Sequence, residues 1–293
     1  MPANLTGARQ RISSIDILRG LIMIIMALDH VRDYFHITAI NADPTDLATT
    51  TPALFFTRWI THFCAPLFVF LSGLSAYISG QNKTKKELSA FLIKRGLWLI
   101  VVEIVLINFI LTFNPSYNII LLTVIWVIGW SMVILGLLVR GSYRLVLITG
   151  LVLFIGHNIL DYFNLPLTGA AGATWQILLT TPGSGYPIGG GRIVAVGYAI
   201  LPWASIMLLG YAAGVIYKTG FDPARRKRIL IATGVGMILL FLLLRGFNLY
   251  GDPTKWSEQG SDLYTLLSFL RVTKYPVSLH FACMTIGPGL IFL

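Results

Sequence analysis

The chain has 293 residues, of which 56% are hydrophobic and only 12% are charged, about half the charged share of a soluble domain. Its mean hydropathy of +0.76 is typical of a membrane protein. The net charge is +10, but the basic residues lie in short loops between apolar stretches. Membrane topology explains this distribution better than a nucleic-acid-binding surface does, and we expect no nucleic-acid partner. We therefore expect one domain over residues 1–293, embedded in the lipid bilayer.

Eight stretches are apolar enough to cross the bilayer as helices of about 20 residues. They cover roughly 15–36, 54–80, 91–113, 117–139, 143–163, 193–217, 227–250 and 265–293. This pattern predicts an all-α fold, a polytopic transmembrane bundle of about eight helices. The last stretch reaches Leu293 without a polar tail. Either this helix ends near the cytoplasmic surface, or, as we favour, the chain is a fragment of a larger bundle that lacks its C-terminal helices.

Basic residues occupy every second connection between these stretches, whereas the connection at 37–53 contains no Lys or Arg. Under the positive-inside rule this alternation predicts a cytoplasmic N-terminus, and we expect the protein in the plasma (inner) membrane. The Gly-, Pro- and Thr-rich connection at 164–192 then lies outside the cytoplasm. It forms either a lid or re-entrant loop over a site, or an ordinary surface loop.

Ionisable residues gather in the outer halves of the predicted helices. They include Asp29, His30, Arg32, Asp33 and His36 on the first stretch, and Arg58 and His62 on the second. Ionisable groups at such depth are costly and usually face a protein or water-filled interior. The spacings i, i+3, i+4 and i+7 from Asp29, and i, i+4 from Arg58, place them on shared helix faces. The pattern predicts a polar outer cavity with a histidine general base. The alternative is that these charges pair to lock helices together or extend to the membrane interface.

The five histidines raise the question of a metal ion. No two of them have the His-x3-His spacing with which a helix binds zinc. We therefore expect no metal.

Four segments carry a resemblance to a known family. Asp16-x-x-Arg19-Gly20 followed by His30 resembles the first helix of the transmembrane acyltransferases, and HFCAPLFVFLSGLSAYI resembles the apolar signature of their second helix. The segments GYAILPWASIMLLGYAAG and FLRVTKYPVSLHFACMTIGPGL are similar to parts of bacterial membrane proteins of the heparan-α-glucosaminide N-acetyltransferase type.

The resemblance implies an enzyme that moves an acetyl or other acyl group from cytosolic acyl-CoA to a sugar or glycan hydroxyl or amine across the membrane. His30 matches the histidine of the first-helix motif, and Asp16 and Arg19 match its acidic and basic positions. The O-acetylating branch of the family has an Arg-x-x-Arg pair after its second helix. Here Arg95 is followed three residues later by Trp98 and not by a second arginine. The resemblance therefore predicts the class of reaction better than it predicts the acceptor substrate.

On this hypothesis His30 deprotonates the acceptor or carries the acyl group itself. Asp29 or Asp33 orients its ring, and Arg58 or His62 stabilises the oxyanion. Four basic residues on the cytoplasmic side are expected to bind the phosphates of CoA. The alternative is that they only follow the positive-inside rule and bind no ligand. These residues are Lys94, Arg95, Arg140 and Arg144. The rival hypothesis is a proton-coupled transporter or flippase, against which we note the lack of an internal repeat in the sequence.

Overall fold

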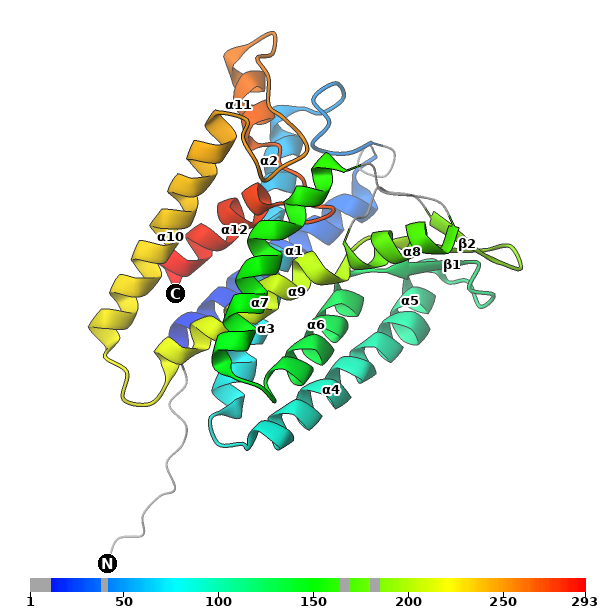
Figure 1. Cartoon of the computed structure of the whole chain (residues 1–293). Helices are drawn as coiled ribbons and strands as arrows, with labels where there is room; N and C mark the ends of the chain where they lie inside the picture. Colours follow the sequence, from blue (N-terminus) through cyan, green and yellow to red (C-terminus); the bar gives the residue numbers. More distant parts are fainter. Residues whose placement is uncertain (1–11, 38–41, 164–168, 180–184) are drawn as a thin grey trace, which may run out of the picture.

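The computed structural model describes residues 12–37, 42–163, 169–179 and 185–293 (Figure 1). These residues are mostly helical, so the all-α class is confirmed apart from one small sheet. The helices are α1 (Ser13–Phe35), α2 (Pro52–Thr61), α3 (Cys64–Gly80), α4 (Lys85–Val102), the π-helix η1 (Glu103–Ile107), α5 (Asn108–Thr112), α6 (Val124–Leu138), α7 (Tyr143–Gly156), the 3-10 helix η2 (His157–Tyr162), α8 (Gly169–Leu178), α9 (Ile200–Ala213), the 3-10 helix η3 (Gly214–Tyr217), α10 (Pro223–Gly246), α11 (Asp262–Leu270) and α12 (Leu279–Phe292).

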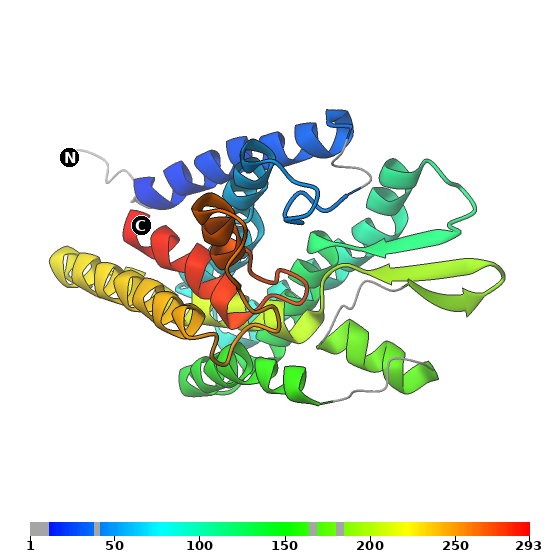
Figure 2. The same cartoon turned by 90° about the horizontal axis from the view of Figure 1, so that it is seen from above.

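Helix α9 lies at the centre of the bundle, where it packs against α3, α6 and α7. Around this core α4 packs on α6, α10 packs on α12, and α1 contacts α2 and α3 from one side (Figure 2). Much of the outward face of α1 is apolar and exposed, for example at Ile17, Ile24 and Phe35. An apolar helix face without a protein partner is what a lipid environment accommodates.

The contact between α3 and α9 depends on two glycines. A Cβ atom on Gly73 would lie 2.0 Å from the carbonyl oxygen of Met207, and one on Gly210 would lie 2.1 Å from that of Phe70. Only residues without a side chain permit backbones to approach this closely. Two of the segments that carry the family resemblance therefore pack directly on each other.

A three-stranded sheet lies to one side of the bundle, beside α8 (Figure 2). Its strands are β1 (Ile119–Leu122), β2 (Gly185–Gly189) and β3 (Arg192–Val196), in the order β1-β3-β2. Strand β1 is parallel to β3, with Ile119 opposite Ile193, and β2 is antiparallel to it. The predicted outer loop at 164–192 thus contains a helix and strands, and residues 164–168 and 180–184 lie outside the described part.

The prediction of a helix over 117–139 is wrong in its first part, where β1 forms. The side chain of Asn108 donates to the carbonyl of Leu121 at 2.9 Å and accepts from its N–H at 2.5 Å. Glu103 accepts the N–H of Thr123 at 2.8 Å. Because these side chains satisfy the backbone of 121–123, the strand is held extended and α6 begins only at Val124.

The prediction of one helix over 265–293 is also wrong. Helix α11 ends at Leu270, where the guanidinium of Arg245 donates to the carbonyls of Ser268, Phe269 and Arg271. Pro276 disfavours a helix at the residue before it, because its ring clashes with that backbone. Helix α12 then starts after Ser278, whose hydroxyl accepts the N–H of Phe281. Residues 271–278 form a loop between the two helices.

Four helical segments in the described residues are long and apolar enough to cross a membrane, at 52–80, 143–162, 200–217 and 223–246. Helices α6 and α12 are apolar but shorter. This supports a membrane protein and does not support the count of eight spanning helices. The predicted orientation is not tested, and the N-terminal Arg9 and Arg11 lie outside the described residues.

Candidate functional site

Charged side chains join the ends of α1 and α2. Arg58 donates through Nη1 to both carboxylate oxygens of Asp29, at 2.9 and 3.1 Å. Arg32 donates to Asp29 and, at 2.7 Å, to Asp33. The hydroxyl of Thr61 completes the shell around Asp29. The structure therefore brings together the predicted residues Asp29 and Arg58, and it adds a threonine that the sequence analysis did not identify.

His62 lies next to this ion-pair cluster, at the break between α2 and α3. Its side chain is almost fully buried, its ring centroid lies 5.1 Å from that of Phe281, and its Nδ1 has no hydrogen-bond partner among the described residues. His62 and Arg58 both line a polar cavity of about 210 Å³, which we call the outer cavity. Its other lining residues are Asp43, Thr45, Thr254, Arg271, Val272, Thr273, Lys274 and Tyr275.

Asp252 holds the 271–278 loop against this cavity. Its carboxylate accepts the N–H of Thr273 at 2.8 Å, the hydroxyl of Thr273 at 2.8 Å and the hydroxyl of Ser278 at 2.6 Å. It also accepts the N–H of Thr254 at 2.8 Å, within a turn that Gly251, Asp252 and Pro253 favour. The turn was recognisable in the sequence, but the distant partners of Asp252 were not.

Tyr275 of this loop contacts Tyr198, which lies just before α9. The hydroxyl of Tyr275 donates to that of Tyr198 at 3.4 Å, and their rings pack edge to face. Burial raises the pKa of Tyr198 well above its ordinary value. Tyr198 therefore stays protonated at neutral pH and acts as a neutral hydrogen-bonding group.

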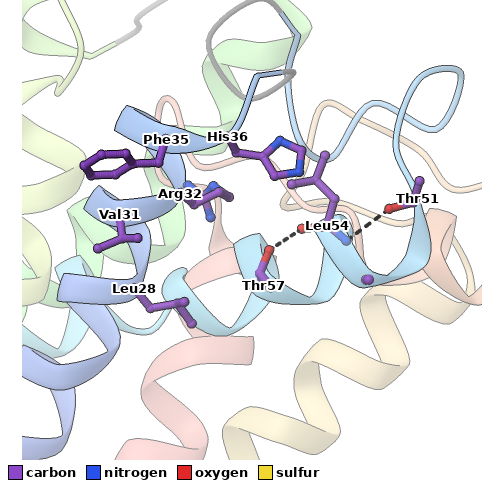
Figure 3. A pocket seen from close by; sticks show the side chains of 9 residues that line it. Leu28, Val31, Arg32, Phe35, His36, Thr51, Leu54 and Thr57 are labelled. Atoms are coloured by element: carbon purple, nitrogen blue, oxygen red, sulfur yellow. Dashed lines mark hydrogen bonds between the residues drawn. The ribbon is translucent and has the colours of Figure 1, made fainter.

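His30, the predicted base, lies on the exposed side of α1 and does not line the outer cavity. Its role stays a prediction. The neighbouring Asp33 is 45% exposed, whereas Arg32 is only 4% exposed. Arg32 instead lines an open, mostly apolar groove of about 390 Å³. Figure 3 shows Leu28 and Phe35 of α1 and Leu54 of α2 around it.

The other end of α1 carries the motif pair Asp16 and Arg19. Their side chains lie 3.6 Å apart, and Arg19 also donates to the hydroxyl of Ser75 on α3. Both members of the pair are partly exposed. Arg19 therefore ties α1 to α3, far along the helix from Asp29.

A second cavity, of about 320 Å³, lies at the far end of α3, and we call it the inner cavity. It is lined by Tyr77, Gly80, Lys83, Lys85, Leu88, Val139, Tyr143, Val146, Tyr211 and Val215. The four residues predicted to bind CoA are not among this lining. Lys94, Arg95 and Arg144 are exposed, and Arg140 donates to the hydroxyl of Ser89 at 2.8 Å. Two lysines that the sequence analysis did not select, Lys83 and Lys85, line the cavity instead.

Within the described ranges, no group of three His, Cys, Asp or Glu side chains is placed to hold a metal ion. The chemistry that the two cavities offer is that of imidazole, guanidinium, ammonium and hydroxyl groups. Such groups can move a proton, bind an anion and stabilise an oxyanion.

Comparison of the sequence with known proteins places the chain in a family. The sequence model described as "Heparan-alpha-glucosaminide N-acetyltransferase, catalytic" matches residues 11–246. No curated protein matches the chain. The matched range contains α1 to α10, both helices of the ion-pair cluster, His62 and the inner cavity, but it ends before the 271–278 loop. The chain belongs to the heparan-α-glucosaminide N-acetyltransferase catalytic family and is a membrane acetyltransferase of that family.

Proposed function

We propose that the protein moves an acetyl group from cytosolic acetyl-CoA to a hydroxyl or amine of a sugar on the outer side of the plasma membrane. The two cavities support this proposal because they lie at opposite ends of α3. His62 precedes the first residue of α3, and Tyr77 and Gly80 lie in its last turn. The 17 residues of α3 span roughly 25 Å, which approaches the ~30 Å thickness of the hydrocarbon core.

The inner cavity is the proposed donor site, on the cytoplasmic side. Lys83 and Lys85 would pair with phosphates of CoA through charge-assisted hydrogen bonds. Tyr77, Tyr143 and Tyr211 offer aromatic faces for the adenine ring or the pantetheine arm. The cavity continues toward a neighbouring pocket with a further basic residue, Lys218, since the two share Tyr77 and Tyr211.

The outer cavity is the proposed acceptor site, with His62 as general base. The observation that carries this assignment is a buried imidazole at the wall of a polar cavity, with Arg58 beside it in a fixed position. The acetyl-pantetheine arm of the bound CoA would extend from the inner cavity along α3 to bring the thioester to His62. A ring nitrogen of His62 would take the proton of the acceptor hydroxyl or amine as the acceptor attacks the acetyl carbonyl. The carbon–sulfur bond then breaks, and CoA leaves as a thiolate that takes up the proton held by His62, which restores the neutral imidazole. Arg58 would stabilise the oxyanion formed in between.

His30 remains the competing base from the sequence, and one experiment separates the two histidines. The purified protein in lipid nanodiscs is incubated with radiolabelled acetyl-CoA and a panel of amino sugars and neutral sugars. We expect acetyl transfer by the native protein, a loss of about 100-fold or more in His62→Gln, and little change in His30→Gln. A large loss only in His30→Gln would move the base to α1. Failure of the native protein to bind acetyl-CoA or transfer acetyl to any acceptor would overturn the proposed function.

A further inference from the structure

The outer cavity is lined by more positive than negative charge. Among its described lining residues, three side chains are cationic, those of Arg58, Arg271 and Lys274, and one is a carboxylate, that of Asp43. The Asp43 carboxylate forms hydrogen bonds within its own turn, where its Oδ1 accepts both the N–H and the hydroxyl of Thr45 at 2.8 Å. Among the described residues, Asp43 forms no ion pair with any of the three cations.

Arg58 is neutralised by Asp29, but the two cations of the 271–278 loop are not paired in this way. Among the residues that the structure describes, no carboxylate lies within ion-pair distance of Lys274 or Arg271. Lys274 is nevertheless only 9% exposed, and its Nζ lies beside the Tyr275 side chain, 5.1 Å from the ring centroid. Asp29 acts on this ammonium group only from beyond ion-pair distance. A buried ammonium group without a counter-ion is costly, and a bound anion would remove that cost.

We propose that Lys274, supported by Arg271, binds an anionic group of the acceptor, that is, a carboxylate or a phosphate or sulfate ester next to the reacting hydroxyl or amine. This inference rests on the proposed function for the identity of the ligand as the acceptor. The hydroxyls of Thr45, Thr254 and Thr273 in the same lining suit the other oxygens of a sugar ring. The volume of about 210 Å³ lies below the usual ligand pocket of ~300–1,000 Å³. The cavity therefore holds one terminal sugar unit rather than a longer segment.

The residues that would bind the anionic group lie in the C-terminal segment of the chain. Residues 271–278 lie outside the range 11–246 that matches the family model. The loop is fixed at both ends, by Arg245 at the carbonyl of Arg271 and by Asp252 at the hydroxyl of Ser278. A charged group on a fixed loop is preorganised to discriminate between acceptors, because little ordering remains to be done on binding.

The test measures binding without activity. The native protein in phosphatidylcholine nanodiscs is titrated with inorganic phosphate, sulfate, glucuronate and, as the neutral control, glucose, and thermal stabilisation gives the dissociation constants. We expect stabilisation by at least one of the anions but not by glucose, and an affinity lower by about ten-fold or more in Lys274→Ala. Lys274→Arg should retain the affinity, and Lys255→Ala, at an exposed lysine in the nearby 253–258 segment, should not change it.

Equal binding of glucose and the anions, or unchanged anion affinity in Lys274→Ala, would overturn the inference. Repeating the titration with phosphatidylglycerol in the nanodisc separates the two sources of an anion. Competition by this lipid would place a headgroup, not a soluble sugar, on Lys274 and would overturn the acceptor assignment. Anion binding without any acetyl transfer would leave the site in place and count against the proposed function alone.

Discussion

Arg58 and Asp29 join α1 to α2 through a two-point ion pair, with Nη1 of Arg58 2.9 and 3.1 Å from the two oxygens of Asp29. Each side chain is only 16% exposed. Arg32 and Thr61 donate to the same carboxylate, so the charge of Asp29 is surrounded by donors. One carboxylate thus fixes the position of Arg58, which lines the outer cavity, relative to α1.

We expect Asp29→Asn to lower the free energy of unfolding by about 2 to 3 kcal/mol, somewhat below the value for a fully buried pair, because two guanidinium groups lose their counter-ion. Asp16→Asn is the matched control, since Asp16 is 53% exposed and lies 3.6 Å from Arg19. An exposed pair contributes about 1 kcal/mol or less. Thermal unfolding in detergent compares the stability of the Asp29→Asn and Asp16→Asn variants. Equal losses of stability would show that the ion pairs of Asp29 stabilise the fold no more than the exposed pair does.

A second prediction concerns the close approach of α3 and α9. Gly73→Ala would place a methyl group 2.0 Å from the carbonyl oxygen of Met207 and 2.8 Å from the backbone nitrogen of Tyr211. The helices must separate to accommodate it, so we expect a loss of about 3 kcal/mol or more and a lower yield of folded protein.

Gly236→Ala is the control for this substitution, because nothing lies within 4 Å of a Cβ atom there. In an open helical position alanine is the better helix former by about 1 kcal/mol. Gly236→Ala should therefore be neutral or stabilising in the same thermal measurement. If both alanine variants behave alike, the close contact between α3 and α9 is not present in the folded protein.

Apolar length and composition predicted the helical fold, but not where helices stop. The stretch 265–293 is apolar almost throughout, yet the helix is interrupted after Leu270. The interruption depends on Arg245 of α10, whose guanidinium donates hydrogen bonds to the carbonyls of Ser268 and Arg271. The strand at 119–122 likewise depends on Asn108 and on pairing with β3. Such partners lie far away in the sequence, and hydropathy does not report them.

Helix periodicity predicts which side chains of one helix share a face, and only this part of the candidate site could be predicted from the sequence. The i, i+4 spacing of Arg58 and His62 placed both on one face, and the structure places both at the outer cavity. His30 shows where this reasoning ends, because it is one residue from Asp29 but about 100° around the helix, and it lies exposed. Closeness to Asp29 in the sequence therefore did not decide whether the side chain of His30 faces the cavity.

The donor site gives a third prediction. Replacing Lys83 and Lys85 together by Gln should raise KM for acetyl-CoA by about ten-fold or more with little effect on kcat, because charge-assisted hydrogen bonds to phosphates would be lost. The Lys94→Gln and Arg95→Gln double variant is the matched control, since both residues are exposed on α4 and do not line the inner cavity. Steady-state kinetics with varied acetyl-CoA separates the pairs. A rise in KM only for the Lys94 and Arg95 variant would return the donor site to the residues predicted from the sequence.

The last prediction concerns Asp252, which positions the loop that bears Lys274 but does not itself line the outer cavity. Asp252→Asn replaces one carboxylate oxygen by an amide NH2 group, which cannot accept the bonds that Oδ1 or Oδ2 now accepts. We expect the 271–278 loop to loosen, with kcat/KM for the acceptor about ten-fold lower and KM for acetyl-CoA unchanged, because the inner cavity is at the other end of α3. Hydrogen exchange should speed up in 271–278 and stay unchanged in α9. Faster exchange with full activity would mean that the loop does not form part of the acceptor site, whereas unchanged exchange would mean that Asp252 does not hold it.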